Sequence, residues 1–242
     1  MKKSVFICLV SFLCIVLVSI ILFGICFVVP IYKNTESKQI VSALPTIVID
    51  CGHGGPDGGA VGADGTCEKD INLALGFALR EILIQNGYQV VMTREKDAFI
   101  CDDHSASLRE QNVSDIHNRL KIAKSVPNSL FISIHMNNFS DTRYWGSQLF
   151  YGPKNKQSIT MSEAIQKRLV TTVQKGNDRP LKQMDSSVYI IYNAPMPALL
   201  LECGFMSNTA ELNRFKNTQY RCSFAFSVFL GINDYIKGVK HV

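Results

Sequence analysis

The apolar and polar positions divide the chain into two parts. Residues 5–29 form an apolar run without a charged residue. As a helix this run is about 37 Å long, enough to cross the roughly 30 Å hydrocarbon core of a bilayer. Lys2 and Lys3 precede it, which favours a cytoplasmic N-terminus and an external remainder. We expect a membrane anchor at residues 1–32 and a polar linker at 33–43. A cleaved signal peptide is the alternative, disfavoured because signal peptides have shorter apolar regions.

The pattern changes beyond the linker, where residues 44–238 are expected to form one catalytic domain. Short apolar runs alternate there with stretches whose apolar positions repeat every three or four residues. This alternation predicts an α/β fold with a mostly parallel or mixed central sheet flanked by helices. The expected extended segments are 46–50, 88–93, 130–135, 147–151, 188–192 and 199–202, and the expected helices are 69–86, 113–125, 162–173, 208–215 and 222–237.

Composition excludes several classes of protein. Hydrophobic residues make up 47% of the chain and charged residues 19%, which excludes a disordered or fibrous protein. The net charge of +5 comes without a basic block, so we do not expect a nucleic-acid binder. Five cysteines follow the apolar run without a C-x-x-C pair, and we expect mostly free thiols. They are Cys51, Cys67, Cys101, Cys203 and Cys222.

Candidate chemistry gathers where three expected strands end. His53, His135 and Glu202 follow such strands, and Glu68 opens the first helix. Sites in open α/β sheets form outside the carboxyl ends of strands, and two imidazoles with a carboxylate are a common catalytic zinc set. A further carboxylate can then move a proton. Each residue also has a simpler interpretation, as a satisfied polar group or a helix-dipole partner. Asp57 and Asp64 are most simply turn formers.

Several short motifs together resemble one known family. They are DCGHGG at 50–55, EKD at 68–70, MTR at 92–94, NR at 118–119, LFISIHMN at 130–137 and ECGFMSN at 202–208. In order and spacing they resemble the zinc-dependent N-acetylmuramoyl-L-alanine amidases of the Amidase_3 group, from about residue 46 to 236. The resemblance implies a zinc ion held by His53, Glu68 and His135, with Glu202 as the catalytic carboxylate.

The resemblance also implies the bond that is cut, the amide between the lactyl group of N-acetylmuramic acid and L-Ala of the peptidoglycan stem peptide. Arg94 and Arg119 are candidates to meet stem-peptide carboxylates, or else form salt bridges. Asn137 and Asn208 are candidates for substrate hydrogen bonds, or else turn residues. Cys51, Cys67 and Cys203 depart from the family pattern beside these motifs; we interpret them as small buried hydrophobes, with oxidation targets or zinc ligands as the alternative.

The N-terminal anchor, the absence of wall-binding repeats and the polar loop 94–110 are similar to spore-cortex amidases of the CwlD type. Those enzymes remove stem peptides, after which a deacetylase completes muramic-δ-lactam. We therefore expect the catalytic domain outside the membrane, on the wall side or in the intermembrane space of the developing spore, and an activating partner protein is a further expectation. Two alternatives stay open: a partner-activated or binding-only peptidoglycan protein, and a zinc carboxypeptidase acting on the stem peptide.

Overall fold

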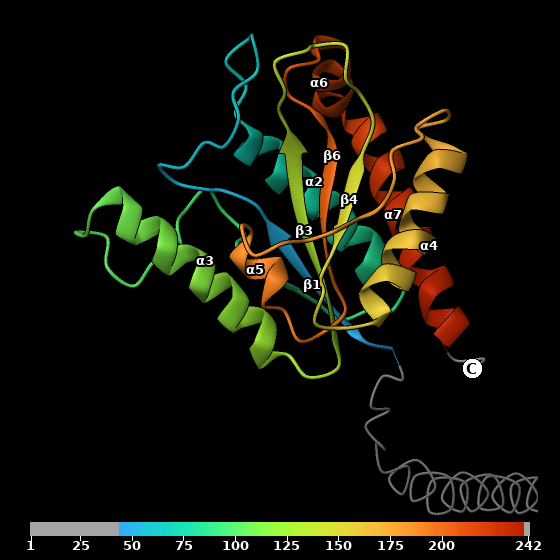
Figure 1. The fold of residues 1–242 in the computed structure, drawn as a ribbon, viewed down its shortest axis with the longest axis horizontal. Coiled ribbons are helices and arrows are strands. Elements are labelled where there is room, and N and C mark those ends of the chain that lie inside the picture. Colours follow the sequence, from blue (N-terminus) through green and yellow to red (C-terminus); the bar gives the residue numbers. More distant parts are fainter. Residues whose placement is uncertain (1–43, 240–242) are drawn as a thin grey trace, which may run out of the picture. The chain divides into compact units, whose positions relative to one another are not determined.

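A six-stranded sheet in the order β2-β1-β3-β6-β4-β5 forms the centre of the structure, a computed structural model that describes residues 44–239 (Figure 1). The four strands β2, β1, β3 and β6 run parallel to one another. Strand β4 is antiparallel to β6, and β5 is parallel to β4. The expected single α/β domain with a mixed sheet is confirmed. The strands are β1 (Thr46–Cys51), β2 (Val90–Met92), β3 (Ser129–Asn137), β4 (Gln148–Tyr151), β5 (Lys182–Gln183) and β6 (Ala198–Phe205).

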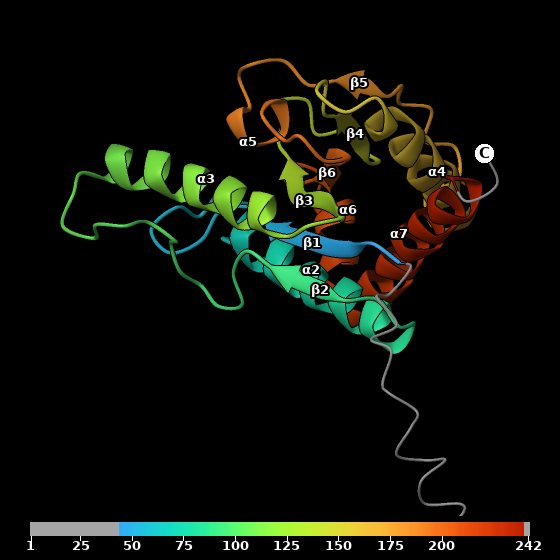
Figure 2. The ribbon, with the colours of Figure 1, turned by 90° about the horizontal axis from the view of Figure 1, so that it is seen from below.

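Helices cover both faces of the sheet (Figure 2). Alternate residues of β1 point to opposite faces: Ile47 and Ile49 pack with α2, α4 and α7, whereas Val48 packs with residues of α3 and α5. The helices are α2 (Glu68–Gln85), α3 (Leu108–Ser125), α4 (Gln157–Thr172), α5 (Tyr189–Tyr192), α6 (Thr209–Lys216) and α7 (Thr218–Val239). Because helices bury both faces of the sheet, the side chains that can share a site are those at the ends of the strands.

Several elements differ from the sequence prediction: α4 begins five residues earlier than expected, strand β5 was not expected, and two further differences have a clear local cause. Helix α3 begins five residues earlier than expected, because Ser107 caps it: its hydroxyl accepts from the Glu110 N–H, and the Glu110 side chain accepts from the Ser107 N–H. The segment expected to be extended at 188–192 instead contains the short helix α5, which buries Ile190 and Ile191. Periodicity alone cannot distinguish a strand from a helix in so short an apolar run.

Within residues 44–239, no helix is long and apolar enough to cross a membrane. The expected anchor at 1–32 and the expected linker at 33–43 lie outside the described residues.

Strand register places three polar side chains on one face of the sheet. His135 of β3 pairs directly with Glu202 of β6, and Glu202 pairs in turn with Gln148 of β4. Directly paired residues point to the same face, so all three lie on the face that α3 and α5 cover. The carboxyl ends of β1, β3 and β6 meet at one edge, which is where the site is built.

Candidate metal centre

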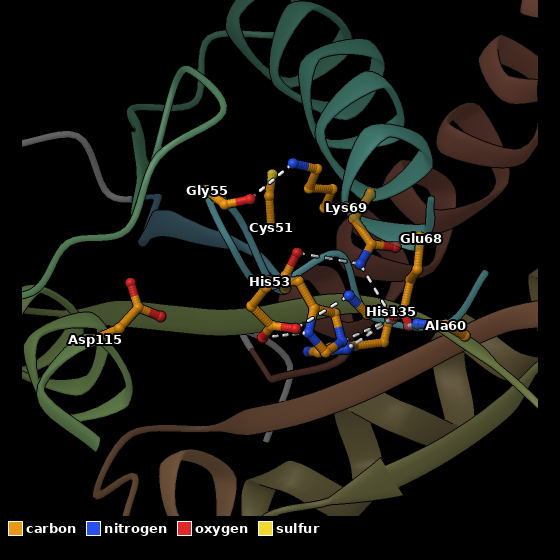
Figure 3. Close-up of polar contacts among 12 residues, drawn as sticks. Cys51, His53, Gly55, Ala60, Glu68, Lys69, Asp115 and His135 are labelled. Carbon is orange, nitrogen blue, oxygen red and sulfur yellow. Dashed lines mark hydrogen bonds and ion pairs between the residues drawn. The ribbon is translucent and has the colours of Figure 1, made fainter. Parts of the chain in front are cut away.

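His53, Glu68 and His135 converge at the carboxyl edge of the sheet (Figure 3). His53 Nε2 lies 3.2 Å and His135 Nδ1 lies 3.0 Å from the same oxygen, Oε1 of Glu68. One potential ligand atom from each of the three residues lies within 4.8 Å of the others. Two imidazole nitrogens and a carboxylate at this spacing match the protein ligands of a catalytic zinc ion.

Three different elements bring these side chains together. His135 is part of β3, Glu68 is the first residue of α2, and His53 lies in the loop after β1. His53 has a φ of +62°, in the left-handed region that non-glycine residues seldom adopt. Gly52 lies against the His135 ring, since a β-carbon at position 52 would be 2.2 Å from Cε1 of that ring. The loop thus needs glycine at 52 in order to bring His53 beside His135.

The carboxylate of Glu68 is held by backbone donors as well as by the two histidines. Its Oε1 accepts from the Met136 N–H at 3.0 Å and from the Asn72 amide at 3.2 Å, and its Oε2 accepts from the Ala60 N–H at 2.9 Å. Burial opposes ionisation, yet the hydrogen bonds from His135 and His53 hold the pKa of Glu68 well below its ordinary value. Glu68 is therefore ionised and oriented, as a metal ligand must be.

Asp57 orients His53 from the other side of its ring. Asp57 Oδ2 lies 2.7 Å from His53 Nδ1, which leaves Nε2 for the metal position. Burial opposes the charged imidazole, but the hydrogen bonds to Asp57 and Glu68 raise the pKa of His53 to about 10. A carboxylate on the second nitrogen of a ligand histidine fixes its orientation and increases its basicity. Asp57 also accepts from the Gly59 N–H at 3.0 Å, so it stabilises the expected turn as well as orienting His53.

Glu202 supplies a second carboxylate beside the cluster. It lies opposite His135 in the β3–β6 pairing, and its Oε2 is buried without a hydrogen-bond partner among the described residues. Burial raises the pKa of Glu202 to about 7. An unpaired buried carboxylate oxygen lowers stability, so its presence here points to a functional role. Glu202 and the three clustered side chains together fit a hydrolytic zinc site with a proton-transferring group.

Arg94 and Arg119 are buried behind the loop, where they bind backbone carbonyls. Arg94 Nε and Arg119 Nη1 both donate to the carbonyl of Cys51, at 2.8 and 2.7 Å, and Arg119 Nη2 donates to the carbonyl of His53 at 2.7 Å. Only 5% of Arg94 and 3% of Arg119 is exposed, and Arg119 also pairs with Asp50 and Asp115. Both arginines therefore shape the loop that carries His53, and Arg119 forms the salt bridges named as the alternative. The expected contact with stem-peptide carboxylates stays a prediction.

The side chain of Asn208 likewise makes its hydrogen bonds within the protein. It is the N-cap of α6: its Oδ1 accepts from the N–H groups of Ala210 and Glu211, and its Nδ2 donates to the Tyr144 carbonyl. These contacts give Asn208 a structural role at the start of α6, and the expected hydrogen bond to substrate stays a prediction. Asn137 ends β3, and its Oδ1 accepts from the Asn138 N–H at 2.8 Å. Nothing in these contacts assigns Asn137 to a substrate.

The cysteines beside the motifs are not among the clustered ligand atoms. Cys51 and Cys203 are fully buried and pack into the core on the α2 side, and burial raises the pKa of the Cys51 thiol to about 12. Cys67 precedes α2 and is partly exposed. For Cys51 and Cys203, the interpretation as small buried hydrophobes agrees with this packing.

The fold and these residues together are those of an α/β domain with a candidate metal centre at the carboxyl edge of its sheet. Residues 47–234 match the Amidase_3 family model, described as N-acetylmuramoyl-L-alanine amidase, and the chain belongs to this family. The germination-specific N-acetylmuramoyl-L-alanine amidase of Bacillus subtilis (strain 168) is 33% identical over 189 residues, which cover 78% of this chain and 78% of that protein.

Solved structures show the same similarity. The CwlD amidase from Clostridioides difficile, determined in complex with the GerS lipoprotein, superposes with a TM-score of 0.77 and 35% identity. The match covers 81% of this chain and 100% of that one. The catalytic domain of CwlV, an N-acetylmuramoyl-L-alanine amidase from Bacillus (Paenibacillus) polymyxa var. colistinus, has a TM-score of 0.68 at 28% identity, covering 80% of this chain and 99% of that one.

Proposed function

We propose that the protein is a zinc-dependent N-acetylmuramoyl-L-alanine amidase. It hydrolyses the amide between the lactyl group of N-acetylmuramic acid and L-Ala of the peptidoglycan stem peptide. The observation that carries the proposal is the cluster of His53, Glu68 and His135, with ligand atoms within 4.8 Å, beside the unpartnered Oε2 of Glu202. Family membership supports the choice of bond.

Each site residue has a separate role in the proposed hydrolysis. Zinc held by His53, Glu68 and His135 would supply the positive charge that polarises a carbonyl and makes a water molecule more acidic. Glu202 accepts a proton at Oε2 from the water that attacks the lactyl carbonyl carbon. As the carbon–nitrogen bond breaks, Glu202 delivers that proton to the L-Ala nitrogen. The products are a lactyl carboxylate and a stem peptide with a free N-terminal amine.

The two alternative functions fit the observations less well. A binding-only protein needs no convergent metal ligands and no unpartnered carboxylate beside them, yet this chain has both. A zinc carboxypeptidase would use similar metal chemistry, but the family model matched by residues 47–234 is that of an amidase. The identity of the released peptide separates the amidase from the carboxypeptidase.

The biological setting is also a proposal. The similarity to a germination-specific amidase and to the CwlD amidase supports a role in the spore cortex, where a deacetylase would complete muramic-δ-lactam after this enzyme removes the peptide. The CwlD structure contains the GerS lipoprotein, which supports an activating partner here. The apolar residues 5–29 support a membrane anchor with the catalytic domain on the wall side or in the intermembrane space of the developing spore.

The experiment uses the full chain in mild detergent with zinc and purified peptidoglycan. Mass spectrometry should detect released peptides that begin at L-Ala, together with peptide-free muramic acid. Glu202→Gln should abolish release while it retains zinc, whereas Glu163→Gln, a change of an exposed residue on α4, should release peptides like the parent. Peptides shortened only from their C-terminal end would contradict the amidase proposal.

A deletion strain tests the proposed role in the spore cortex. A strain without the protein should make cortex that lacks muramic-δ-lactam.

A further inference from the structure

Beyond the metal centre, Arg179 lies over two aromatic rings. Its guanidinium carbon is 4.6 Å from the ring centre of Phe205 and 5.1 Å from that of Tyr144. The two rings are neighbours, with centres 6.0 Å apart. Arg179 Nε also donates to the Trp145 carbonyl at 3.0 Å. A guanidinium held by two rings and one hydrogen bond has lost much of its conformational freedom before any ligand arrives.

The terminal nitrogens of Arg179 remain available for a ligand. Neither Nη1 nor Nη2 makes a hydrogen bond or an ion pair within residues 44–239. The nearby carboxylate of Glu211 is bound to the N–H groups of Gly146 and Phe205, at 3.0 and 2.9 Å, and forms no salt bridge with Arg179. The side chain lines a surface cleft with Tyr144 and Trp145. Two parallel N–H donors on a fixed plane match the geometry of a carboxylate.

Strand register shows where Arg179 lies relative to the metal centre. Gln148 lies two strands from His135 on the same face, about 10 Å away at roughly 4.8 Å per strand. The Gln148 side chain donates to the carbonyl of Pro180, the residue after Arg179. Phe205, the ring beneath the guanidinium, is on β6 three residues beyond Glu202. Arg179 therefore lies on the side of the site where β6 and β4 continue from Glu202.

We propose that Arg179 is a substrate-binding residue that accepts a carboxylate of the stem peptide; this rests on the proposed amidase function. An extended peptide spans about 3.5 Å per residue, so an acidic residue three or four positions after the scissile amide can reach past Gln148, which is about 10 Å from His135, toward Arg179. Peptidoglycan stem peptides carry free carboxylates in this range. Arg94 and Arg119 are buried behind the loop and Arg143 is paired with Asp141, whereas both terminal nitrogens of Arg179 are unpaired within residues 44–239.

The test compares two substrates that differ only in charge. One is N-acetylmuramoyl-L-Ala-D-Glu-L-Lys with free carboxyl groups, and the other is the same compound with every carboxyl amidated. The zinc-loaded full chain in detergent should cleave the free acid with a KM about tenfold to a hundredfold lower and a similar kcat, as a charge-assisted bidentate contact predicts. Arg179→Gln should remove this preference by raising KM for the free acid, and Arg179→Lys should retain part of it.

Arg143→Gln is the matched control, because Arg143 lines the same cleft but is exposed and paired with Asp141. It should keep the full preference for the free acid. An active Arg179→Gln enzyme with an unchanged preference would overturn the proposal. If the parent chain cleaves neither substrate, the amidase proposal fails, and calorimetry then tests the subsite alone. Binding of the free tripeptide L-Ala-D-Glu-L-Lys that is lost in Arg179→Gln would support the subsite, and equal or undetectable binding would overturn it.

Discussion

The imidazole of His135 lies directly over the α-carbon of Gly52, so closely that the two positions cannot both carry side chains in this arrangement. A β-carbon at 52 would be 2.2 Å from Cε1 and 2.6 Å from Nδ1 of His135. Gly52→Ala should therefore displace His135 from the metal position. We expect zinc affinity to fall at least about tenfold, comparable with the loss of a group that orients a ligand, and activity to fall with it. Competition with a chromophoric chelator measures the affinity.

Gly238→Ala is the control for this substitution, because a β-carbon at Gly238 in α7 would meet nothing within 4 Å. It should bind zinc like the parent. Gly52→Ala should also unfold at a similar denaturant concentration to the parent when both are stripped of metal. Parental zinc affinity in Gly52→Ala would mean that the His135 ring need not occupy its present position.

Asp57 offers a second test of how the ligands are oriented. Asp57→Asn keeps the oxygen that can accept from the Gly59 N–H but removes the negative charge 2.7 Å from His53 Nδ1. Because a carboxylate in this position orients the imidazole and increases its basicity, zinc affinity should fall about tenfold to a hundredfold. Asp64→Asn is the matched variant, since Asp64 lies in the same loop but pairs with Lys216. Equal zinc affinity in the two variants would contradict the role of Asp57.

The cysteine thiols should differ in reactivity according to their burial. Cys51 and Cys203 are fully buried, and burial raises the pKa of both thiols, that of Cys51 to about 12. The thiolate is the reactive form, so both should resist alkylation in the folded protein, whereas the exposed Cys222 should react readily. Peptide mapping after a short iodoacetamide treatment measures each site. Rapid labelling of Cys51 without unfolding would show that the carboxyl end of β1 opens and would contradict this prediction.

Much of the fold followed from the sequence because its signals are local, and the proximity of the central site residues followed from where the strands end. Residues 46–50 are an apolar run that ends on polar residues, and their position in β1 is confirmed. The proximity of His53, Glu68 and His135 is also confirmed, since carboxyl ends of neighbouring parallel strands meet at one edge. Periodicity alone placed the start of α3 too late. The capping-box spacing of Ser107 and Glu110 was the sequence signal that could have predicted it.

The roles of Arg94 and Arg119 depended on tertiary contacts that spacing does not show. An arginine in a polar motif has the same local pattern whether it meets a substrate or binds the carbonyl of Cys51 from behind. The position of Arg179 over Tyr144 and Phe205 likewise joins three segments that are distant in sequence. For Asp57, a carboxylate four residues after His53 was an available signal, but turn formation explained it equally well from the sequence alone.

The buried ion pair of Asp50 and Arg119 predicts how stability depends on pH. Asp50 Oδ1 accepts from Arg119 Nη1 at 2.8 Å and from the Thr93 hydroxyl at 2.7 Å, and Oδ2 accepts from the Ser133 hydroxyl at 2.6 Å. Burial opposes ionisation, yet Arg119 and the two hydroxyls hold the pKa of Asp50 below its ordinary value. Because the unfolded pKa is about 3.9, the ionised group stabilises the fold fully above that pH. This contribution is lost as the pH falls through the lower folded pKa.

Asp50→Asn should therefore lower the free energy of unfolding by about 3–5 kcal/mol at pH 7, since it leaves Arg119 with one carboxylate partner, Asp115. The difference between parent and variant should narrow below about pH 4, where the unfolded parent takes up a proton at Asp50 while the folded parent keeps the charge down to its lower folded pKa. Urea unfolding in the presence of a metal chelator, at pH 7, 5 and 3, measures both effects without a contribution from zinc binding. Asp141→Asn, which removes the partner of the exposed Arg143, should show no comparable loss at pH 7. A gap between parent and Asp50→Asn that stays constant from pH 7 to pH 3 would show that the charge of Asp50 does not stabilise the fold.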